Sequence, residues 1–184
     1  MKVDRQTGWI DAVRRVESPN HDARPSGVSP DLIVIHGISL PPGEFGGSGI
    51  DDLFCNVLDP TAHPYYEEIC HLRVSSHVLI TRDGKLTQYV SFLDRAWHAG
   101  QSSYCGRANC NDFAVGIELE GTDDVPYEPV QYVTLAALIS ALRSTFGSLE
   151  HAELVGHSDI APGRKTDPGP HFDWDLLQHL LVAG

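Results

Sequence analysis

The segment SSHVLITRDGKLTQYV, residues 75–90, constrains the fold of this chain more than any other. It contains two runs of alternating apolar and polar residues on either side of Asp83-Gly84, a pair that accepts the positive φ of a tight hairpin turn. The two strands of such a hairpin are antiparallel. A sheet that includes them is therefore not all-parallel.

Two further segments have the composition of strands. DLIVIHGI, residues 31–38, is a short apolar run rich in β-branched residues, which is typical of a buried strand. AVGIELEG, residues 114–121, alternates instead, so that Val115, Ile117 and Leu119 share one face of the strand. Both segments are expected in the sheet that contains the hairpin.

From residue 129 to residue 146 the hydrophobic period changes and predicts a helix. Pro129 suits the first turn and Gly147 the C-terminal stop. The apolar face comprises Tyr132, Leu135, Ala136, Ile139, Leu142 and Phe146. A final helix is expected through WDLLQHLLV with Asp173 as its N-cap, and DDLFCNVL and PYYEEICHL are weaker helix candidates.

Strands and helices therefore intermix along the chain. This order predicts an α/β fold of the mixed α+β type, with a central mixed β-sheet flanked by helices. A length of 184 residues favours one domain over residues 1–184 rather than two.

The charge of the chain excludes several classes of partner. Lys and Arg number 13 against 25 Asp and Glu, a net charge of -12, so the basic patch that binds nucleic acid is not expected. The N-terminal MKVDRQTGWIDAVRRVE has scattered charges and no continuous apolar run, which is typical of neither a secretory signal nor a membrane span. We therefore expect a cytoplasmic protein without a membrane partner.

The cysteine pattern does not indicate a metal site. The chain has four cysteines, and Cys105 and Cys110 are separated by four residues rather than the two of a zinc knuckle. In a cytoplasmic protein we expect Cys55, Cys70, Cys105 and Cys110 to be reduced and to pack as small residues.

Two of the ten histidines end predicted strands, where a buried imidazole needs a partner. His36 ends DLIVIHGI, and His157 ends HAELVGH. Asp167 follows in LVGHSDIAPGRKTDPGPHFDW, residues 154–174, for which the prolines and glycines predict a loop without a helix. Two imidazoles and one carboxylate can hold a zinc ion with a fourth position open for catalysis. The spacing alone is also compatible with no metal site. In that alternative, His36 and His157 are ordinary histidines at strand ends, and Asp167 is the aspartate of an Asx turn.

Five motifs in register resemble the landmarks of the zinc-dependent N-acetylmuramoyl-L-alanine amidase family. In chain order they are VIHGIS, SSHVLITRDGKLTQYV, RAWHAG, CNDFAVGIELEG and GHSDIAPGRKTDPGPHFDW. The resemblance runs from Asn20 to Leu177 and implies one zinc ion per chain, with His36, His157 and Asp167 as ligands. Aspartate rather than cysteine as the third ligand is similar to the cytosolic branch of the family, which acts on soluble 1,6-anhydromuropeptides.

The same resemblance implies roles for two charged residues. Lys165, two residues before Asp167, would stabilise the oxyanion of a tetrahedral intermediate, although an exposed loop cation is the alternative. Glu118, the first glutamate of GIELEG, would be the general base. Glu120 has the same facing on a strand, so the alternation alone does not separate the two carboxylates. His77 is expected to support the sheet or the surroundings of the site.

The resemblance also implies contacts to substrate. Arg73 would bind a carboxylate of the stem peptide, and Trp97 and His98 of RAWHAG would line the cleft. A place in the core is an equal alternative for Trp97. Asn109 stands where close relatives often carry arginine, and Arg107 is a candidate substitute for that contact.

The implied reaction is hydrolysis of the amide bond between (1,6-anhydro-)N-acetylmuramic acid and L-alanine in small muropeptides, a step of peptidoglycan recycling. A wall-lytic amidase acting on polymeric peptidoglycan and a non-catalytic peptidoglycan-binding module remain alternatives. A binding module of this family typically lacks a zinc ligand, and all three expected ligands are present here. The enzyme is therefore favoured.

Overall fold

The computed structural model describes residues 1–183, and its centre is a six-stranded sheet. The strand order is β1-β5-β4-β9-β3-β10. The bounds are β1 Arg14–Arg15, β3 Leu32–Ile38, β4 Val78–Ile80, β5 Leu86–Gln88, β9 Ala114–Glu120 and β10 Glu153–Gly156. β4 and β5 pair antiparallel, whereas the other neighbours in the sheet are parallel. The predicted mixed sheet is confirmed.

The antiparallel pair is the hairpin predicted around Asp83-Gly84. Gly84 has a φ of 77°, a conformation that costs glycine nothing. Its N–H donates to the Thr81 carbonyl over 2.8 Å, and the Thr81 N–H donates to the Lys85 carbonyl over 2.9 Å. The local turn chemistry therefore determines this part of the sheet.

The remaining elements are shorter. Two small ribbons pair β2 (His21–Ala23) with β6 (Asp94–Ala96) and β7 (Ser103–Tyr104) with β8 (Arg107–Ala108). The helices are α1 Gly49–Phe54, α2 Pro64–Ile69, α3 Pro129–Thr145, α4 His157–Ile160 and α5 Trp174–Ala183, and the 3-10 turns are η1 Cys110–Asp112 and η2 Gly147–Leu149. Strands of two or three residues are too short to show a hydrophobic period, so the sequence did not predict the ribbons.

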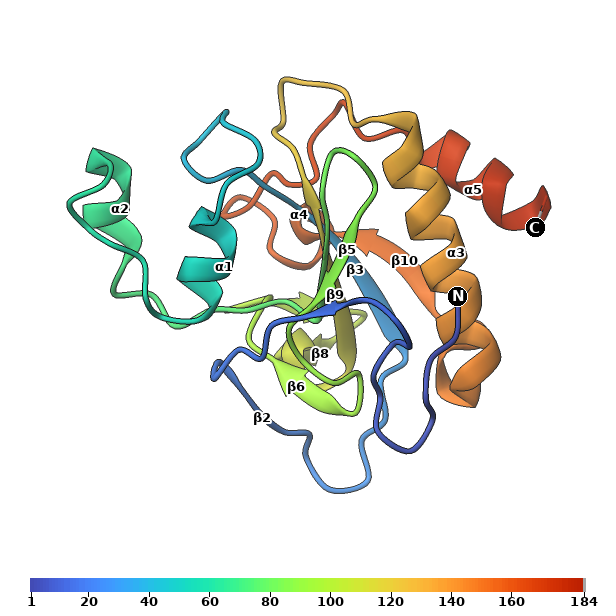
Figure 1. The fold of residues 1–184 in the computed structure, drawn as a ribbon. Helices are drawn as coiled ribbons and strands as arrows, with labels where there is room; N and C mark the ends of the chain where they lie inside the picture. Colours follow the sequence, from blue (N-terminus) through green and yellow to red (C-terminus); the bar gives the residue numbers. More distant parts are fainter. Residues whose placement is uncertain (184) are drawn as a thin grey trace.

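The two faces of the sheet are covered differently. The alternation predicted for residues 114–121 is confirmed, because Val115, Ile117 and Leu119 share a core with the apolar face of α3. Figure 1 shows α3 and α5 together on one side of the sheet, with α1 and α2 on the other. Strand residues of the opposite parity enter two smaller clusters on that second side. The chemistry-bearing side chains of β3 and β9 therefore lie on the face away from α3.

The two strongest helix predictions are confirmed, and a third expectation is wrong. α3 matches the predicted span, and Asp173 accepts a hydrogen bond from the Leu176 N–H over 2.8 Å at the start of α5. The segment 154–174 was expected to contain no helix, yet His157–Ile160 forms the single turn α4. Because Pro162 and Gly163 follow this turn, they limit its length without preventing it.

Within residues 1–183, no helix combines the length and the apolar character that crossing a bilayer requires. All four cysteines are free thiols, and Cys110 is buried. Cys110 packs in a small apolar cluster with Phe113 and Val34.

Candidate metal centre and catalytic cleft

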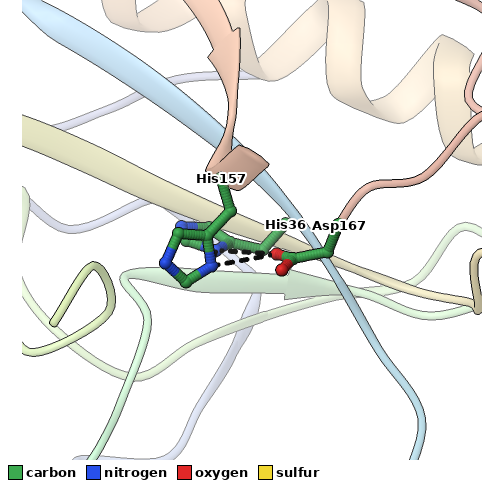
Figure 2. A group of neighbouring side chains, drawn as sticks. All are labelled: His36, His157 and Asp167. Carbon is green, nitrogen blue, oxygen red and sulfur yellow. Dashed lines mark hydrogen bonds and ion pairs between the residues drawn. The ribbon is translucent and has the colours of Figure 1, made fainter. Parts of the chain in front are cut away.

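Three side chains that are distant in sequence meet at the C-terminal ends of β3 and β10 (Figure 2). His36 lies on β3, His157 follows β10 directly, and Asp167 lies in the loop after α4. The Nδ1 atoms of the two histidines are 2.9 Å apart, and Asp167 Oδ2 is 3.2 Å from His36 Nδ1 and 3.1 Å from His157 Nδ1. The structure thus brings together the three ligands expected from the sequence as a group that could hold a metal ion.

The outer ring nitrogens determine which atoms face this centre. His157 Nε2 is 3.2 Å from the Ala99 carbonyl, which accepts only, so Nε2 carries the proton and Nδ1 presents a lone pair. His36 Nε2 is 2.9 Å from His98 Nδ1, and a metal ion at His36 Nδ1 requires the proton on Nε2, where His98 accepts it. Two lone pairs and one carboxylate then face a single point. A divalent cation fits this donor set.

The electrostatics favour the protonation states that a metal needs. Burial lowers the pKa of His36 to about 4 and places the pKa of His98 well below its usual value. Burial opposes the charge of Asp167, but the close contacts of its carboxylate with the His157 and His36 rings hold its pKa below the usual range. At neutral pH, His36 is therefore neutral and Asp167 is ionised, as required for ligation.

A cavity of about 910 Å³ opens beside the three residues, and Glu118 lines it. Glu118 on β9 is the register partner of His36 on β3, so both side chains leave the same face of the sheet. Burial, together with the charge of Asp167, raises the pKa of Glu118 well above its usual value. Its Oε2 is buried and has no hydrogen-bond partner among the described residues. A cation at the three ligands would counteract the effects of burial and of the Asp167 charge on the pKa of Glu118. It would therefore favour the ionised carboxylate.

Glu120 lies on the same strand face but binds backbone instead. Its Oε2 accepts a hydrogen bond from the Arg82 N–H over 3.0 Å, and its Oε1 accepts one from the Gly46 N–H. The side chain is buried and does not line the cavity. The structure therefore distinguishes the two carboxylates that the alternation left equivalent.

Lys165 lines the cavity from the loop between α4 and Asp167, and its side chain is exposed. Its positive charge acts to lower the pKa of both Glu118 and His36, which places it within electrostatic range of the two. The Lys165 N–H donates to the Ala161 carbonyl over 3.1 Å, so the residue comes at the end of a turn. Lys165 and Asp167 line the same cavity.

Two of the expected substrate contacts do not line the cavity. The Arg73 guanidinium donates to the carbonyls of Cys70 and Leu72, over 3.3 and 3.1 Å, within its own loop. Trp97 is half-buried, and its backbone N–H donates to the Asn20 carbonyl over 3.2 Å. The alternative of a packing role suits Trp97 in this conformation.

His98, the third expected substrate contact, does line the cavity, and its ring also contacts His36. Arg107 instead donates to both carboxylate oxygens of Asp31, over 2.9 and 2.8 Å, and lies outside the cavity. Asn109 adopts a φ of 60°, which asparagine tolerates better than most residues. Arg107 is therefore not placed to make the substrate contact that an arginine at position 109 would make.

Of two supports behind the centre, sequence reasoning missed Arg164, whereas His77 was expected to support the sheet or the surroundings of the site. Arg164 Nη2 donates to the Ala99 carbonyl over 2.7 Å, next to the contact of that carbonyl with His157. His77 is fully buried behind His98, and the Gly116 N–H donates to its Nδ1 over 3.0 Å. Contacts to backbone atoms leave no pattern of residue types in a sequence. The available signal for these supports was therefore their place in the motifs that resemble the amidase family.

This fold and this site define the class of protein. Residues 26–170 match the family model described as N-acetylmuramoyl-L-alanine amidase, and the chain belongs to this amidase family. The resemblance inferred from the five motifs is confirmed.

Particular relatives are similar over most of this chain. The chain is 58% identical over 175 residues to the 1,6-anhydro-N-acetylmuramyl-L-alanine amidase AmpD of Citrobacter freundii, a match covering 95% of this chain and 93% of that protein. A crystal structure of selenomethionine AmpD has a TM-score of 0.94 at 55% identity and covers 98% and 99% of the two chains. The Escherichia coli amidase AmiD, solved with the substrate anhydro-N-acetylmuramic acid-L-Ala-D-γ-Glu-L-Lys, has a TM-score of 0.58 at 27% identity, covering 85% of this chain and 60% of that chain.

Proposed function

We propose that this protein is a zinc-dependent 1,6-anhydro-N-acetylmuramyl-L-alanine amidase of peptidoglycan recycling. Residues 1–184 form its single amidase domain, and it acts on small muropeptides in the cytoplasm. The observation that carries the proposal is the convergence of His36 Nδ1, His157 Nδ1 and Asp167 Oδ2 beside the cavity lined by Glu118. The chain is 58% identical to AmpD in a match that covers 95% of its length, and this similarity supports the anhydromuropeptide as substrate.

His36, His157 and Asp167 would hold the zinc ion. Two imidazoles and a carboxylate match the three protein ligands of a catalytic zinc site, and zinc when bound supplies a Lewis acid and a water with a pKa of about 7. The Ala99 carbonyl and His98 Nδ1 keep the two rings turned so that their Nδ1 atoms face the ion.

Glu118 acts as the general base. Its carboxylate faces the cavity and takes the proton of the attacking water. It then gives this proton to the nitrogen of L-alanine as the amide bond breaks. The hydrogen bonds that occupy both oxygens of Glu120 are absent at Glu118 Oε2, which therefore has a lone pair available for the proton.

Lys165 stabilises the oxyanion. The carbonyl oxygen of the lactyl group becomes negative when water adds to it, and the Lys165 ammonium donates a hydrogen bond to it at that point. Because the negative charge is largest in the tetrahedral intermediate, this contact lowers the barrier more than it strengthens substrate binding.

The size of the cavity supports a small substrate. A volume of about 910 Å³ falls in the range of about 300–1,000 Å³ typical of small-molecule sites. A muropeptide that carries a single sugar residue is a ligand of this size class. A polymer of peptidoglycan requires an extended groove instead.

The test is release of the stem peptide. Purified protein is incubated with 1,6-anhydro-N-acetylmuramyl tripeptide, and the free tripeptide is quantified by liquid chromatography and mass spectrometry before chelation, after chelation and after return of zinc. We expect release that chelation abolishes and zinc restores. Saturable binding without release would contradict the proposal in favour of a binding module, and clearing of purified sacculi at the same rate would favour a wall-lytic enzyme.

A further inference from the structure

The consecutive residues His98 and Ala99 contact both proposed histidine ligands from behind the centre. His98 Nδ1 is 2.9 Å from His36 Nε2, and the Ala99 carbonyl oxygen is 3.2 Å from His157 Nε2. One dipeptide therefore supplies the hydrogen-bond acceptor for the outer nitrogen of each ring. The direction in which each Nδ1 points depends on where this dipeptide lies.

One side chain binds both backbone N–H groups of this dipeptide. Asn111 Oδ1 accepts a hydrogen bond from the His98 N–H over 3.1 Å and another from the Ala99 N–H over 2.7 Å. Two backbone donors face the same atom, so that atom must be the amide oxygen rather than the nitrogen. The backbone carbonyl of Asn111 in turn accepts a hydrogen bond from Arg24 Nη1 over 3.2 Å. This bond holds the Asn111 backbone in place.

We propose that Asn111 is a positioning residue of the metal centre. It fixes the backbone of His98 and Ala99, and these two residues fix the rings of His36 and His157. Asn111 does not line the cavity, so its effect reaches the centre through the dipeptide. The inference rests on the proposed function, because it concerns the affinity of these ligands for zinc.

Gly116 limits the position of the same dipeptide from the sheet side. A Cβ atom added to Gly116 would lie 2.4 Å from His98 Cγ, closer than two carbon atoms approach when they are not bonded. Gly116→Ala therefore forces the His98 ring away from β9 without changing Asn111. The substitution therefore displaces His98 Nδ1, the hydrogen-bond acceptor for His36 Nε2, and leaves the Asn111 side chain unaltered.

The experiment measures zinc affinity of the full chain by competition with a chromogenic chelator, alongside the melting temperature. Asn111→Ala is expected to weaken zinc binding about 10- to 100-fold, the cost typical of losing a group that orients a metal ligand. Asn111→Asp keeps an oxygen that accepts from both N–H groups, so we expect an affinity within about threefold of the unmodified protein. Asn109→Gly is the matched control, because Asn109 makes no side-chain capping bond and glycine adopts its positive φ.

Unchanged zinc affinity in folded Asn111→Ala would overturn the inference, and so would an equal loss in Asn111→Asp. If Asn111→Ala does not fold, Asn111→Ser is measured in its place: weaker zinc binding supports the inference, and unchanged zinc affinity overturns it. Gly116→Ala tests the separate step from the dipeptide to the histidine rings, and unchanged zinc affinity in that variant also overturns the inference. Absence of zinc binding by the unmodified protein would instead overturn the proposed function, so the two failures are distinguishable.

Discussion

His36 and Glu118 are register partners on the adjacent parallel strands β3 and β9, and their side chains enter the same cavity. One is a proposed metal ligand and the other the proposed general base. Backbone hydrogen bonds of the central sheet therefore set the distance between ligand and base, whereas Lys165 and Asp167 come from a loop. A site built on strands holds its geometry more closely than one built on loops alone.

Glu118→Gln is expected to lower kcat by about 100-fold or more while zinc stays bound, because an amide cannot take the proton of water. Glu120→Gln is the matched control. It removes a buried carboxylate from the same strand face, but from outside the cavity, and its effect on kcat should be much milder. Steady-state release of stem peptide and zinc content measure both variants. The reverse order of effects would assign the general base to Glu120.

Lys165→Ala is expected to lower kcat about 100-fold, the typical loss of an oxyanion donor, without loss of zinc. Lys85→Ala serves as the control, since Lys85 is an exposed hairpin lysine paired with Asp83. Turnover and metal content are measured together. Near-normal turnover of Lys165→Ala would remove this residue from the mechanism.

His157→Ala should abolish both zinc binding and activity, because His36 and Asp167 alone hold zinc poorly. The control is His151→Ala, which alters a side chain that is 91% exposed. Inductively coupled plasma mass spectrometry after gel filtration gives the zinc content. Full zinc occupancy in His157→Ala would contradict the ligand assignment.

The stability of the fold should depend on pH through His77. Burial, with the nearby charge of Arg24, lowers the pKa of His77 to about 3. An unfolded histidine binds its proton near pH 6.5, so between about pH 6.5 and 3 the unfolded chain takes up the proton that the native ring refuses. The stability that neutral His77 contributes is therefore complete above about pH 6.5. It declines as pH falls, by up to about 1.4 kcal/mol per unit.

Urea unfolding of the metal-free protein at several pH values between 5 and 7.5 measures this slope against His77→Gln. The variant should be less stable at pH 7.5, because the Gly116 N–H loses its acceptor, but its free energy of unfolding should fall less steeply with decreasing pH. Equal slopes for the two proteins would show that His77 does not contribute the linkage.

The elements predictable from sequence are those long enough to show a period, together with the short strands β4 and β5, which the Asp83-Gly84 turn marks. α3 spans 17 residues with a continuous apolar face, and β9 alternates over seven. α4 is a single turn and β6 has three residues, so neither had enough length for a pattern to emerge. Which strands lie side by side depends on long-range packing, and the order of the sheet was not predicted.

The site was predictable to the extent that its residues follow strands or belong to quoted motifs. His36 lies in the C-terminal half of β3 and His157 directly follows β10, and both were identified as imidazoles that burial makes costly without a partner. The resemblance implied the roles of Glu118 and Lys165. Asn111 was not identified because it acts on backbone N–H groups, which have no residue signature. The direction of Arg73 is set by carbonyls of its own loop, which no hydrophobic period encodes.

The position of the metal tests the central claim most directly. Anomalous diffraction at the zinc absorption edge, from crystals of zinc-loaded protein, should give one peak per chain about 2.0–2.2 Å from His36 Nδ1, His157 Nδ1 and an oxygen of Asp167. A zinc peak bound by other residues, with these three side chains turned away from one another, would contradict the account.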